Sequence, residues 1–571
     1  MASYENFYKG SYSTLEPEFG DYIGYTYKFG AGRIGAPTSP QTADQIKQVT
    51  SRLSEGMRTV EMQVLSPETL EAIPKDHLKE INRLAKLTGS EMTMHAPVID
   101  PAGFTKEGWS ETNRDEAERR LLEAVERGHE MNPEGNIPVT IHASTLPAAE
   151  FTQEGQESVA AVDPESGKLV TFKREERFEP EEGKVVAYSP KEELEHFNDM
   201  QWREQIRLLE ERKAEIDALF MESRKISQKL EEKEKKGEEL SQADLTEGSA
   251  AIAGIKRARA LSAHLNAALR GIYPKAYEYD EEARAELEKA AAGYRADLEE
   301  IEKIREPLQA GFMLNIANEK LIEGLRYASP KFYKPVEEFA IDKASKTLGN
   351  VAFEAYKQFG ETAPVISVEN VFPNMAFSRA EQLRNLIEES RKQFVENAVN
   401  EGMSRGEAKR EAEKHIGATW DTGHINLLRK EGFGEEKIIE ETKTIAPYIK
   451  HVHLTDNFGY ADTHLPPGMG KVPVKGIMEE LEKAGYSGKF IAEAGGFAKE
   501  FKISPHPYVL EALGSPLYHP IMAPYWSKSG YGAVFPEHYV SIYGTGFAGV
   551  PAELGGMMPG KKSRFAGTPA E

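Results

Sequence analysis

The sequence predicts an α/β fold, a (β/α)8 barrel, and two observations support this prediction. From about residue 31, short apolar or β-branched runs alternate with amphipathic helical stretches, the pattern of strand–helix units around a parallel sheet. Eight such runs can be counted, and the segments that contain them, 31–145 and 346–498, total about 270 residues, near the ~250 typical of a barrel. We therefore expect one closed barrel that is interrupted after its fourth strand.

The first four strands are expected before residue 146, in runs rich in apolar and β-branched residues. Apolar residues at helical spacing predict helices at 76–89 and 114–132, and Gly89 is a typical residue at a helix C-terminus. The four strands are predicted at 34–38, 58–65, 91–98 and 136–144.

Residues 146–345 break the alternation and predict an insertion. Turn-like pairs near 163–167 and 181–183 indicate a small β-meander. Apolar residues at three- and four-residue steps then predict a long helix over 191–236, with further helices near 248–270 and 280–305 that would form a helical hairpin or bundle. Its runs KEKK and KRAR are read as a solvated helix face, with nucleic-acid contact as the alternative, and the insertion is also a candidate surface for a protein partner.

The alternation resumes near Ser345 and predicts the second half of the barrel. Its strands are expected at 364–372, 416–426, 448–457 and 488–496, and its helices at 345–359, 379–414, 435–445 and 475–485. Residues 1–30 form an N-terminal extension, and the Gly/Pro/Tyr-rich residues 499–571 form a C-terminal extension that fits no strand–helix unit. We expect the latter to be an ordered strap on the barrel or on a partner subunit.

Composition and charge restrict the class of protein. Apolar residues make up 39% of the chain, which supports globular folding, and the net charge of −22 disfavours a protein that coats nucleic acid. The chain has no cysteine, so any metal must be held by His, Asp and Glu. The first 20 residues contain no apolar signal core, and no run of ~18 apolar residues occurs, so we expect neither export nor membrane insertion but a cytoplasmic protein.

Six successive predicted strands, the third to the eighth, lead into a potential metal ligand. The carboxyl ends of barrel strands meet at one mouth, where chemistry takes place. Four carboxylates and five imidazoles gathered there would be costly unless cations neutralised the charge. Zinc suits this set, manganese or magnesium are alternatives, and the ligands suffice for two to three ions with open positions. The expected metal ligands are His95, His142, Glu369, Asp421, His424, His453, Asp462, His464 and Glu493.

Three further segments are candidates for substrate contact or support. Phe104 and Trp109, in the loop after the third strand, are predicted to stack on a base or sugar; the alternative is a loop folded on its own aromatic rings. Asn370 is expected to bind substrate or, like Asp456, to hydrogen-bond an imidazole. The sequence HLPPGMG at 464–470 is read as a rigid turn rather than a phosphate cradle.

These motifs resemble those of the endonuclease IV and xylose isomerase-like TIM barrel superfamily. The resemblance covers the two barrel segments and implies a TIM barrel with a metal-dependent activity. The segments similar to the superfamily motifs, in the same order, are MHAP (94–97), TIHAS (140–144), SVEN (367–370), WDTGH (420–424), HVHLTDN (451–457), ADTHLPPGMG (461–470) and FIAEAGG (490–496).

The resemblance implies different metal sites in its two branches. The sugar isomerases and epimerases typically hold one metal with four groups, which match Glu369, Asp421, His453 and Glu493 here. The endonuclease IV branch, also called AP endonuclease family 2, uses nine groups, and all nine positions are filled. That branch implies one zinc on His95, His142 and Glu369, a second on Glu369, Asp421, His453 and Glu493, and a third on His424, Asp462 and His464.

Our first expectation is therefore an endonuclease IV-like phosphodiester hydrolase of the apurinic/apyrimidinic type, with DNA as a candidate substrate. Glu369 would bridge two ions, and Glu493 or Asp421 would hold the nucleophile. The alternative is a sugar or sugar-phosphate isomerase or epimerase with a single divalent metal, in which a glutamate moves a proton. A second alternative is a metal-stabilised scaffold, which is disfavoured because structural metal sites need four ligands rather than nine.

Overall fold

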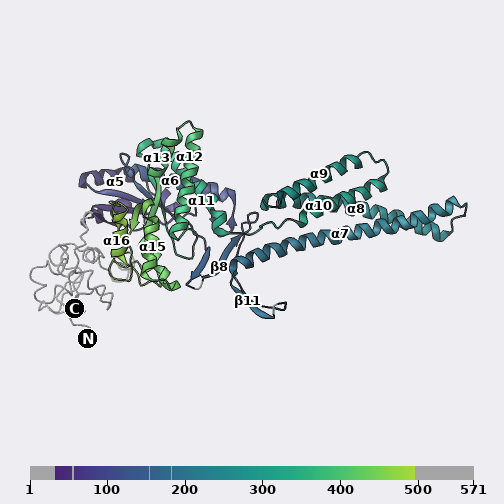
Figure 1. Cartoon of the computed structure of the whole chain (residues 1–571). Coiled ribbons are helices and arrows are strands. Elements are labelled where there is room, and N and C mark those ends of the chain that lie inside the picture. Colours follow the sequence, from purple (N-terminus) through teal and green to yellow (C-terminus); the bar gives the residue numbers. More distant parts are fainter. Residues whose placement is uncertain (1–32, 55–56, 154, 182, 495–571) are drawn as a thin grey trace, which may run out of the picture. The chain divides into compact units, whose positions relative to one another are not determined.

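The computed structural model describes residues 33–54, 57–153, 155–181 and 183–494 (Figure 1). The chain divides into two compact units: Met1–Thr171 with Pro335–Glu571, here called the barrel unit, and Phe172–Lys334, here called the insertion unit. Both predicted extensions, 1–30 and 499–571, lie outside the described residues, and so does the expected strap.

Eight parallel strands close into a barrel in the order β1-β16-β15-β14-β13-β6-β3-β2, which confirms the predicted fold class. Strands β6 and β13 flank the insertion in sequence, yet they pair directly, with His142 beside Glu369. The strands are β1 (Ile34–Pro37), β2 (Thr59–Gln63), β3 (Glu91–His95), β6 (Pro138–His142), β13 (Val365–Glu369), β14 (Ile416–Asp421), β15 (Ile449–His453) and β16 (Phe490–Ile491).

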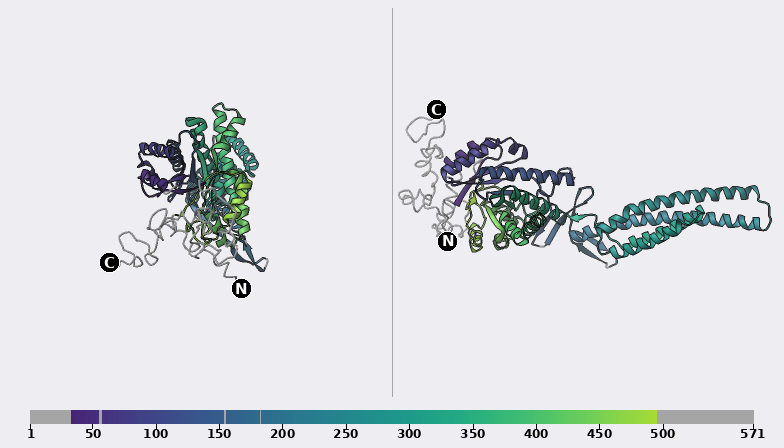
Figure 2. Two further views of the ribbon diagram at one scale, coloured as in Figure 1. Left: turned by 90° about the vertical axis from the view of Figure 1, so that its left-hand side faces the viewer. Right: turned by 90° about the horizontal axis from the view of Figure 1, so that it is seen from above.

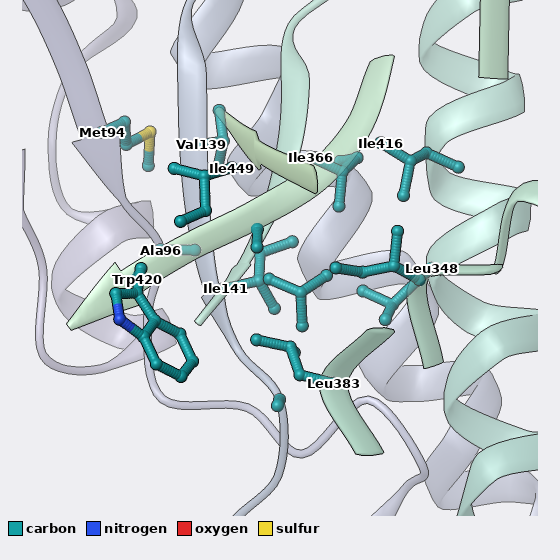
Figure 3. Packing of buried hydrophobic residues seen from close by; sticks show 14 of the residues in the cluster. Met94, Ala96, Val139, Ile141, Leu348, Ile366, Leu383, Ile416, Trp420 and Ile449 are labelled. Atoms are coloured by element: carbon teal, nitrogen blue, oxygen red, sulfur yellow. The ribbon is translucent and has the colours of Figure 1, made fainter. Parts of the chain in front are cut away.

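Helices surround the barrel strands (Figure 1). Figure 3 shows how the two layers pack: Ile141 and Ile366 on the strands lie near Leu348 and Leu383 on the helices, and all four are fully buried. The helices of this unit are α3 (Gln45–Ser54), α4 (Pro67–Glu71), α5 (Lys75–Thr88), α6 (Glu111–Met131), α11 (Val336–Phe359), α12 (Ala380–Asn400), α13 (Arg405–His415), α14 (Thr422–Asn426), α15 (Glu435–Ile445) and α16 (Val474–Lys483).

Several predicted elements of the barrel unit are wrong in their bounds, and local contacts explain two of the differences. The single helix expected over 379–414 is two helices, because Gly402 has φ +97° and the Ser404 side chain accepts the backbone N–H of Glu407, which starts α13. The strand expected over 416–426 ends at Asp421. Its carboxylate accepts the N–H of His424 at 2.7 Å, so Asp421 caps the short helix α14 and ends the strand.

The predicted meander is divided between two sheets. Strands β7 (Ala149–Thr152) and β8 (Gly155–Val162) pair antiparallel, and β9 (Leu169–Lys173) follows the expected turn, where the Gly167 N–H donates to the Asp163 carbonyl. Strands β10 (Glu175–Glu179) and β11 (Lys184–Tyr188) form their own two-stranded sheet around a turn at Gly183, which has φ +66°. Glycine suits both turns because each requires a positive φ.

The insertion unit contains four helices rather than the three expected. They are α7 (Pro190–Lys235), α8 (Gln242–Tyr279), α9 (Arg284–Ile301) and α10 (Pro307–Arg326). Reciprocal capping boxes, Ser189 with Glu192 and Ser241 with Asp244, start the two long helices, which run side by side (Figure 2). The unit buries its own apolar cluster, which includes Trp202, Ile216, Phe220, Leu265, Leu269, Leu287, Leu321 and Ile322.

No helix in the described part of the chain is long and apolar enough to cross a membrane.

The described residues also include several short elements. The short elements are β4 (Phe104–Thr105), β5 (Gly108–Trp109), β12 (Lys334–Pro335) and the 3-10 helices η2 (Gly360–Thr362), η3 (Leu427–Glu431) and η4 (Ala446–Tyr448).

Candidate metal centre

The candidate ligands lie at the carboxyl ends of neighbouring barrel strands. His95, His142, Glu369, Asp421 and His453 are the last residues of β3, β6, β13, β14 and β15. The parallel register places His142 level with Glu369 and Asp421 level with His453. Side chains at matching positions of adjacent strands therefore meet at one mouth of the barrel, as the sequence predicts.

Glu369 lies at the centre of this group. Its Oε2 atom is 3.1 Å from His95 Nε2 and 3.2 Å from His142 Nε2. Its Oε1 atom is 2.6 Å from His453 Nδ1, and the same nitrogen is 3.7 Å from Oε1 of Glu493. One carboxylate thus links three imidazoles from three different strands.

The loop after β15 adds a second cluster. Asp462 Oδ2 lies 2.6 Å from His464 Nε2 and 3.6 Å from His424 Nε2, and His464 Nδ1 is 3.6 Å from Glu493 Oε2. His464 has φ +47°, a conformation that residues other than glycine rarely adopt. The backbone accepts this strain where it turns the imidazole toward the two carboxylates.

All nine predicted ligands come together at this mouth. Asp421 Oδ2 and Asp462 Oδ1 are buried and have no hydrogen-bond partner among the described residues, which leaves both oxygens free to coordinate a cation. The donor set of imidazoles and carboxylates therefore fits a divalent metal. Groups of three with ligand atoms within 4.8 Å of one another are His95–Glu369–His453, Glu369–Asp421–His424, Asp421–His453–Glu493, His424–Asp462–His464 and Glu61–His451–His453.

The two glutamates of the centre differ in their electrostatics. Burial by itself would raise the pKa of Glu369. The imidazoles of His453, His142 and His95 overcome this effect and hold that pKa well below its usual value. Burial raises the pKa of Glu493, and the nearby Glu369 and Glu61 carboxylates act in the same direction. Glu369 is thus kept ionised, whereas Glu493 holds a proton more readily than an ordinary glutamate.

Most imidazoles of the centre are held protonated by the carboxylates. Burial opposes the protonation of His95 and His464, yet the Glu369 and Asp462 carboxylates raise their pKa values to about 9. Burial likewise opposes protonation of His424 and His453, but adjacent carboxylates raise both pKa values well above the ordinary range. A divalent cation would take the place of these protons.

Backbone carbonyls orient two of the rings. His95 Nδ1 lies 2.8 Å from the Ala96 carbonyl, and His424 Nδ1 lies 2.8 Å from the Asn370 carbonyl. Each ring therefore donates from Nδ1 and turns Nε2 to the centre, as expected for metal-binding histidines.

Asn370 and Asp456 support the site in ways that the sequence did not indicate. The Asn370 amide donates to the Asp421 carbonyl at 3.0 Å and accepts the Asp421 N–H at 2.7 Å, so it holds the backbone of a ligand instead of lining the cavity. The Asp456 carboxylate accepts backbone N–H groups of Gly468, Gly470 and Val472 at 2.8–3.0 Å instead of an imidazole N–H. The Asp456 carboxylate thus occupies these N–H groups, which agrees with the predicted turn at 464–470 rather than with a phosphate cradle.

Phe104 and Trp109 lie away from the centre. They belong to the β4–β5 hairpin and pack edge-to-face on Phe339, with ring centroids 6.0 and 4.9 Å apart. The Trp109 indole N–H donates to the Ala102 carbonyl at 2.9 Å. Both rings pack on Phe339 of α11 and neither lines the cavity, so the structure agrees with the alternative of a folded-back loop rather than with stacking on a substrate.

A cavity of about 530 Å³ opens beside the candidate ligands. Its volume suits a small molecule. Its polar lining consists of seven of the nine ligands, without Asp421 and His453, together with Gln63, Ser144 and Thr145, and no Lys or Arg is among the described residues that line it. Its apolar lining consists of Pro40, Val64, Leu65, Val98, Val371, Phe372 and Met375.

Sequence reasoning missed Glu61, Gln63 and His451. Glu61 and Gln63 lie on β2, where Gln63 donates to Glu493 and Glu61 contacts His451 and His453. The signal was a carboxylate inside an apolar strand, RTVEMQVL, and a second histidine two residues before His453, on the same side of its strand.

Comparison with known families agrees with this architecture. Residues 366–512 match the family model described as "Xylose isomerase-like TIM barrel". The match covers the second half of the barrel, and the closed eight-stranded parallel barrel agrees with the fold that the description names.

Individual relatives resemble short segments only. The chain is 36% identical over 75 residues to the uncharacterized protein MJ1311 of Methanocaldococcus jannaschii, which is 13% of this chain and 24% of that protein. It is 28% identical over 78 residues to fructoselysine 3-epimerase of Escherichia coli O157:H7, which is 14% of this chain and 27% of that protein. The chain thus spans about a quarter of the length of these curated relatives.

Two solved structures are similar at low identity. A D-tagatose 3-epimerase-like protein is 13% identical, with 84% of this chain and 96% of that chain covered and a TM-score of 0.38. D-psicose 3-epimerase from Clostridium cellulolyticum H10, solved with D-tagatose, is 8% identical, with 86% and 99% covered and a TM-score of 0.37.

Proposed function

We propose that this protein is a metal-dependent isomerase or epimerase that acts on a sugar or a similar polyol without a phosphate group. The observation that supports this most directly is the cavity: Glu369, Glu493 and several imidazoles face it, and no Lys or Arg is among its described lining residues. Phosphate groups are usually bound by the cationic side chains of Lys and Arg. The partial similarity to fructoselysine 3-epimerase favours the same class.

Glu369, Asp421, His453 and Glu493 would hold the cation. Zn²⁺, Mn²⁺ and Mg²⁺ all suit this donor set, and the further imidazoles allow two to three ions. A bound divalent cation would polarise a substrate carbonyl and its neighbouring hydroxyl, which acidifies the C–H bond between them.

Glu493 is the residue that we assign to proton transfer. Its pKa is raised by burial, whereas the imidazoles keep Glu369 ionised, and such a difference between paired carboxylates is typical of acid–base catalysis. Glu493 would take the proton from the carbon beside the carbonyl while the C–H electron pair forms the enolate. For inversion, a water molecule on the opposite face would protonate the same carbon, and the hydroxide that is left would take the proton held by Glu493. For isomerisation, Glu493 would return its proton to the former carbonyl carbon while the hydroxyl proton moves to the former carbonyl oxygen. Gln63 donates to Glu493 and orients it.

The apolar lining of the cavity complements this chemistry. Leu65, Val98 and Phe372 belong to it. They would contact the carbon skeleton of the substrate and exclude water from the reacting centre.

Solvent exchange at carbon tests this proposal. Metal-loaded protein is incubated in D₂O with a panel of ketoses and aldoses, and deuterium at the C–H positions beside the carbonyl is followed by NMR. We expect exchange or epimer formation with at least one sugar, and loss of both in Glu493→Gln. Absence of exchange with every sugar, at confirmed metal loading, would overturn the proposal.

A phosphodiester hydrolase of the endonuclease IV type is the second candidate. The His424–Asp462–His464 cluster favours it, because a four-ligand isomerase site does not need these residues. Cleavage of duplex DNA that contains an abasic site, compared with intact duplex at the same low salt concentration, tests this function. Cleavage that requires Asp462 and His464 would place the hydrolase first.

A further inference from the structure

A carboxylate lies inside the barrel directly behind the candidate metal centre. Glu61, in the middle of β2, is fully buried. The Thr93 hydroxyl donates to its Oε2 at 3.1 Å, and His451 Nε2 lies 3.1 Å from the same oxygen. His453 Nε2 lies 3.2 Å from Oε1 and 3.3 Å from Oε2. A buried carboxylate is tolerated only when such donors compensate its charge.

The two ring nitrogens of His453 therefore face different carboxylates on opposite sides of the ring. Nε2 faces Glu61, whereas Nδ1 faces Glu369 at 2.6 Å and Glu493 at 3.7 Å. A neutral imidazole carries one N–H, and the nitrogen without it is the one that can bind a metal. When Glu61 accepts the proton of Nε2, the lone pair of Nδ1 is left for the centre.

Glu61 is itself held in place from two other strands. Thr93 lies on β3, and His451 lies on β15 two residues before His453, so both histidines project to the same side of their strand. The two rings meet edge-to-face at 5.2 Å, and His451 and Thr93 are almost fully buried. The barrel wall thus fixes the carboxylate that faces His453.

We propose that Glu61 is a positioning residue, which fixes the ring of His453 with Nδ1 toward the metal and is itself held by His451 and Thr93. This inference rests on the metal centre of the proposed function but not on the identity of the substrate. It adds to the predicted ligands a residue from the second strand, for which no role was expected.

A separate metal ion between Glu61, His451 and His453 would be a different interpretation of the same cluster. Such an ion would occupy Nε2 of His453 while Nδ1 of the same ring serves the centre. Among the described residues it would also have only these three His or carboxylate donors in a closed interior, where structural metal ions usually have four. The hydrogen-bonded arrangement accounts for the contacts without a further ion.

The test compares Glu61→Gln with Glu441→Gln in the full chain. Glu441 is a matched control, since it is also a buried carboxylate and accepts hydrogen bonds from Arg379 and from the Ala380 N–H, away from the centre. Affinity for Zn²⁺ is measured by competition with a chelator, and the Co²⁺-loaded proteins are compared by their visible absorption spectra. We expect Glu61→Gln to lose about 10- to 100-fold in affinity and to change the Co²⁺ spectrum.

Thr93→Val provides a milder variant in case Glu61→Gln does not fold. It removes one donor to Glu61 and should weaken Zn²⁺ binding in the same direction by a smaller factor, while Glu441→Gln keeps wild-type affinity. Wild-type affinity and an unchanged Co²⁺ spectrum in both Glu61→Gln and Thr93→Val would overturn the inference. Because no sugar is present, weakened metal binding supports the role of Glu61 even if the proposed sugar chemistry fails.

Discussion

The Nδ1 atom of His453 lies 2.6 Å from the Oε1 atom of Glu369, and this contact joins strands β15 and β13 across the mouth of the barrel. Both strands pair with β14, one on each side of it, so the curvature of the sheet brings the two side chains together over β14. A proton or a metal ion is required between the two groups, because a nitrogen lone pair and a carboxylate oxygen at this distance would otherwise repel each other.

Removal of the metal is expected to destabilise the barrel. A ligand that binds only the folded state adds about 2.7 kcal/mol when its free concentration is 100 times Kd. Thermal unfolding of the purified protein, measured after dialysis against a chelator and again after Zn²⁺ or Mn²⁺ is restored, should show a lower midpoint in the chelated sample. Equal midpoints would argue against a metal centre at these residues.

Metal affinity is expected to rise with pH up to about pH 9. His95 and His464 have pKa values of about 9 in the folded, metal-free protein, above their ordinary value of 6.5. Both are therefore protonated at pH 7 and must lose a proton to bind a metal. The stability that these protons contribute to the metal-free protein is fully present below pH 6.5 and is lost as the pH rises through 9.

Calorimetric titration with Zn²⁺ in buffers of different ionisation enthalpy measures this proton release. More protons should be released per ion at pH 7 than at pH 9.5. A release that does not change with pH would contradict the protonated state of these two histidines.

Asp462→Ala and His464→Ala should each lower the number of bound ions without abolishing sugar turnover. Asp462 and His464 belong to the cluster with His424, whereas Glu369, Asp421, His453 and Glu493 form the proposed catalytic set. Metal analysis of the purified variants gives the stoichiometry, and the deuterium-exchange assay gives turnover. Loss of all turnover while a metal ion is still bound by the proposed catalytic set would show that the cluster of His424, Asp462 and His464 takes part in the reaction.

Glu493→Gln should retain the fold and lower turnover by about 10²–10⁴-fold, the usual contribution of a general acid or base. Glutamine keeps the hydrogen-bonding shape toward Gln63 but cannot accept a proton from carbon. Steady-state rates at saturating metal measure the effect. Wild-type turnover in this variant would mean that another residue moves the proton. Glu369 would be the first residue to examine.

Gly470→Ala should destabilise the loop that presents His464. A Cβ atom at this position would overlap Oδ1 of Asp456. The Asp456 carboxylate also holds the loop, because it accepts the N–H groups of Gly468 and Val472. The midpoint of thermal unfolding and the metal affinity should both fall. Gly434→Ala is the matched control, since no atom lies within 4 Å of its added Cβ, and it should leave both quantities nearly unchanged.

The barrel and its mouth were predictable because the relevant signals are local in sequence. Each strand is a short apolar run, and a ligand such as His95 or Glu369 follows directly at its end, so the position of the strand in the barrel fixes the position of the ligand. The long helix α7 was predicted for the same reason, from apolar residues at helical spacing.

The tertiary structure alone decided which polar residues serve the centre and which support it. From the sequence, Asn370 was expected to contact substrate or an imidazole, and Asp456 an imidazole. In the structure their partners are backbone groups that the closed barrel and the turn bring near. Glu61 faces His453 across 392 residues of sequence, a contact that no local pattern contains. Strand periodicity determines where a side chain points, whereas closure of the barrel determines what it meets.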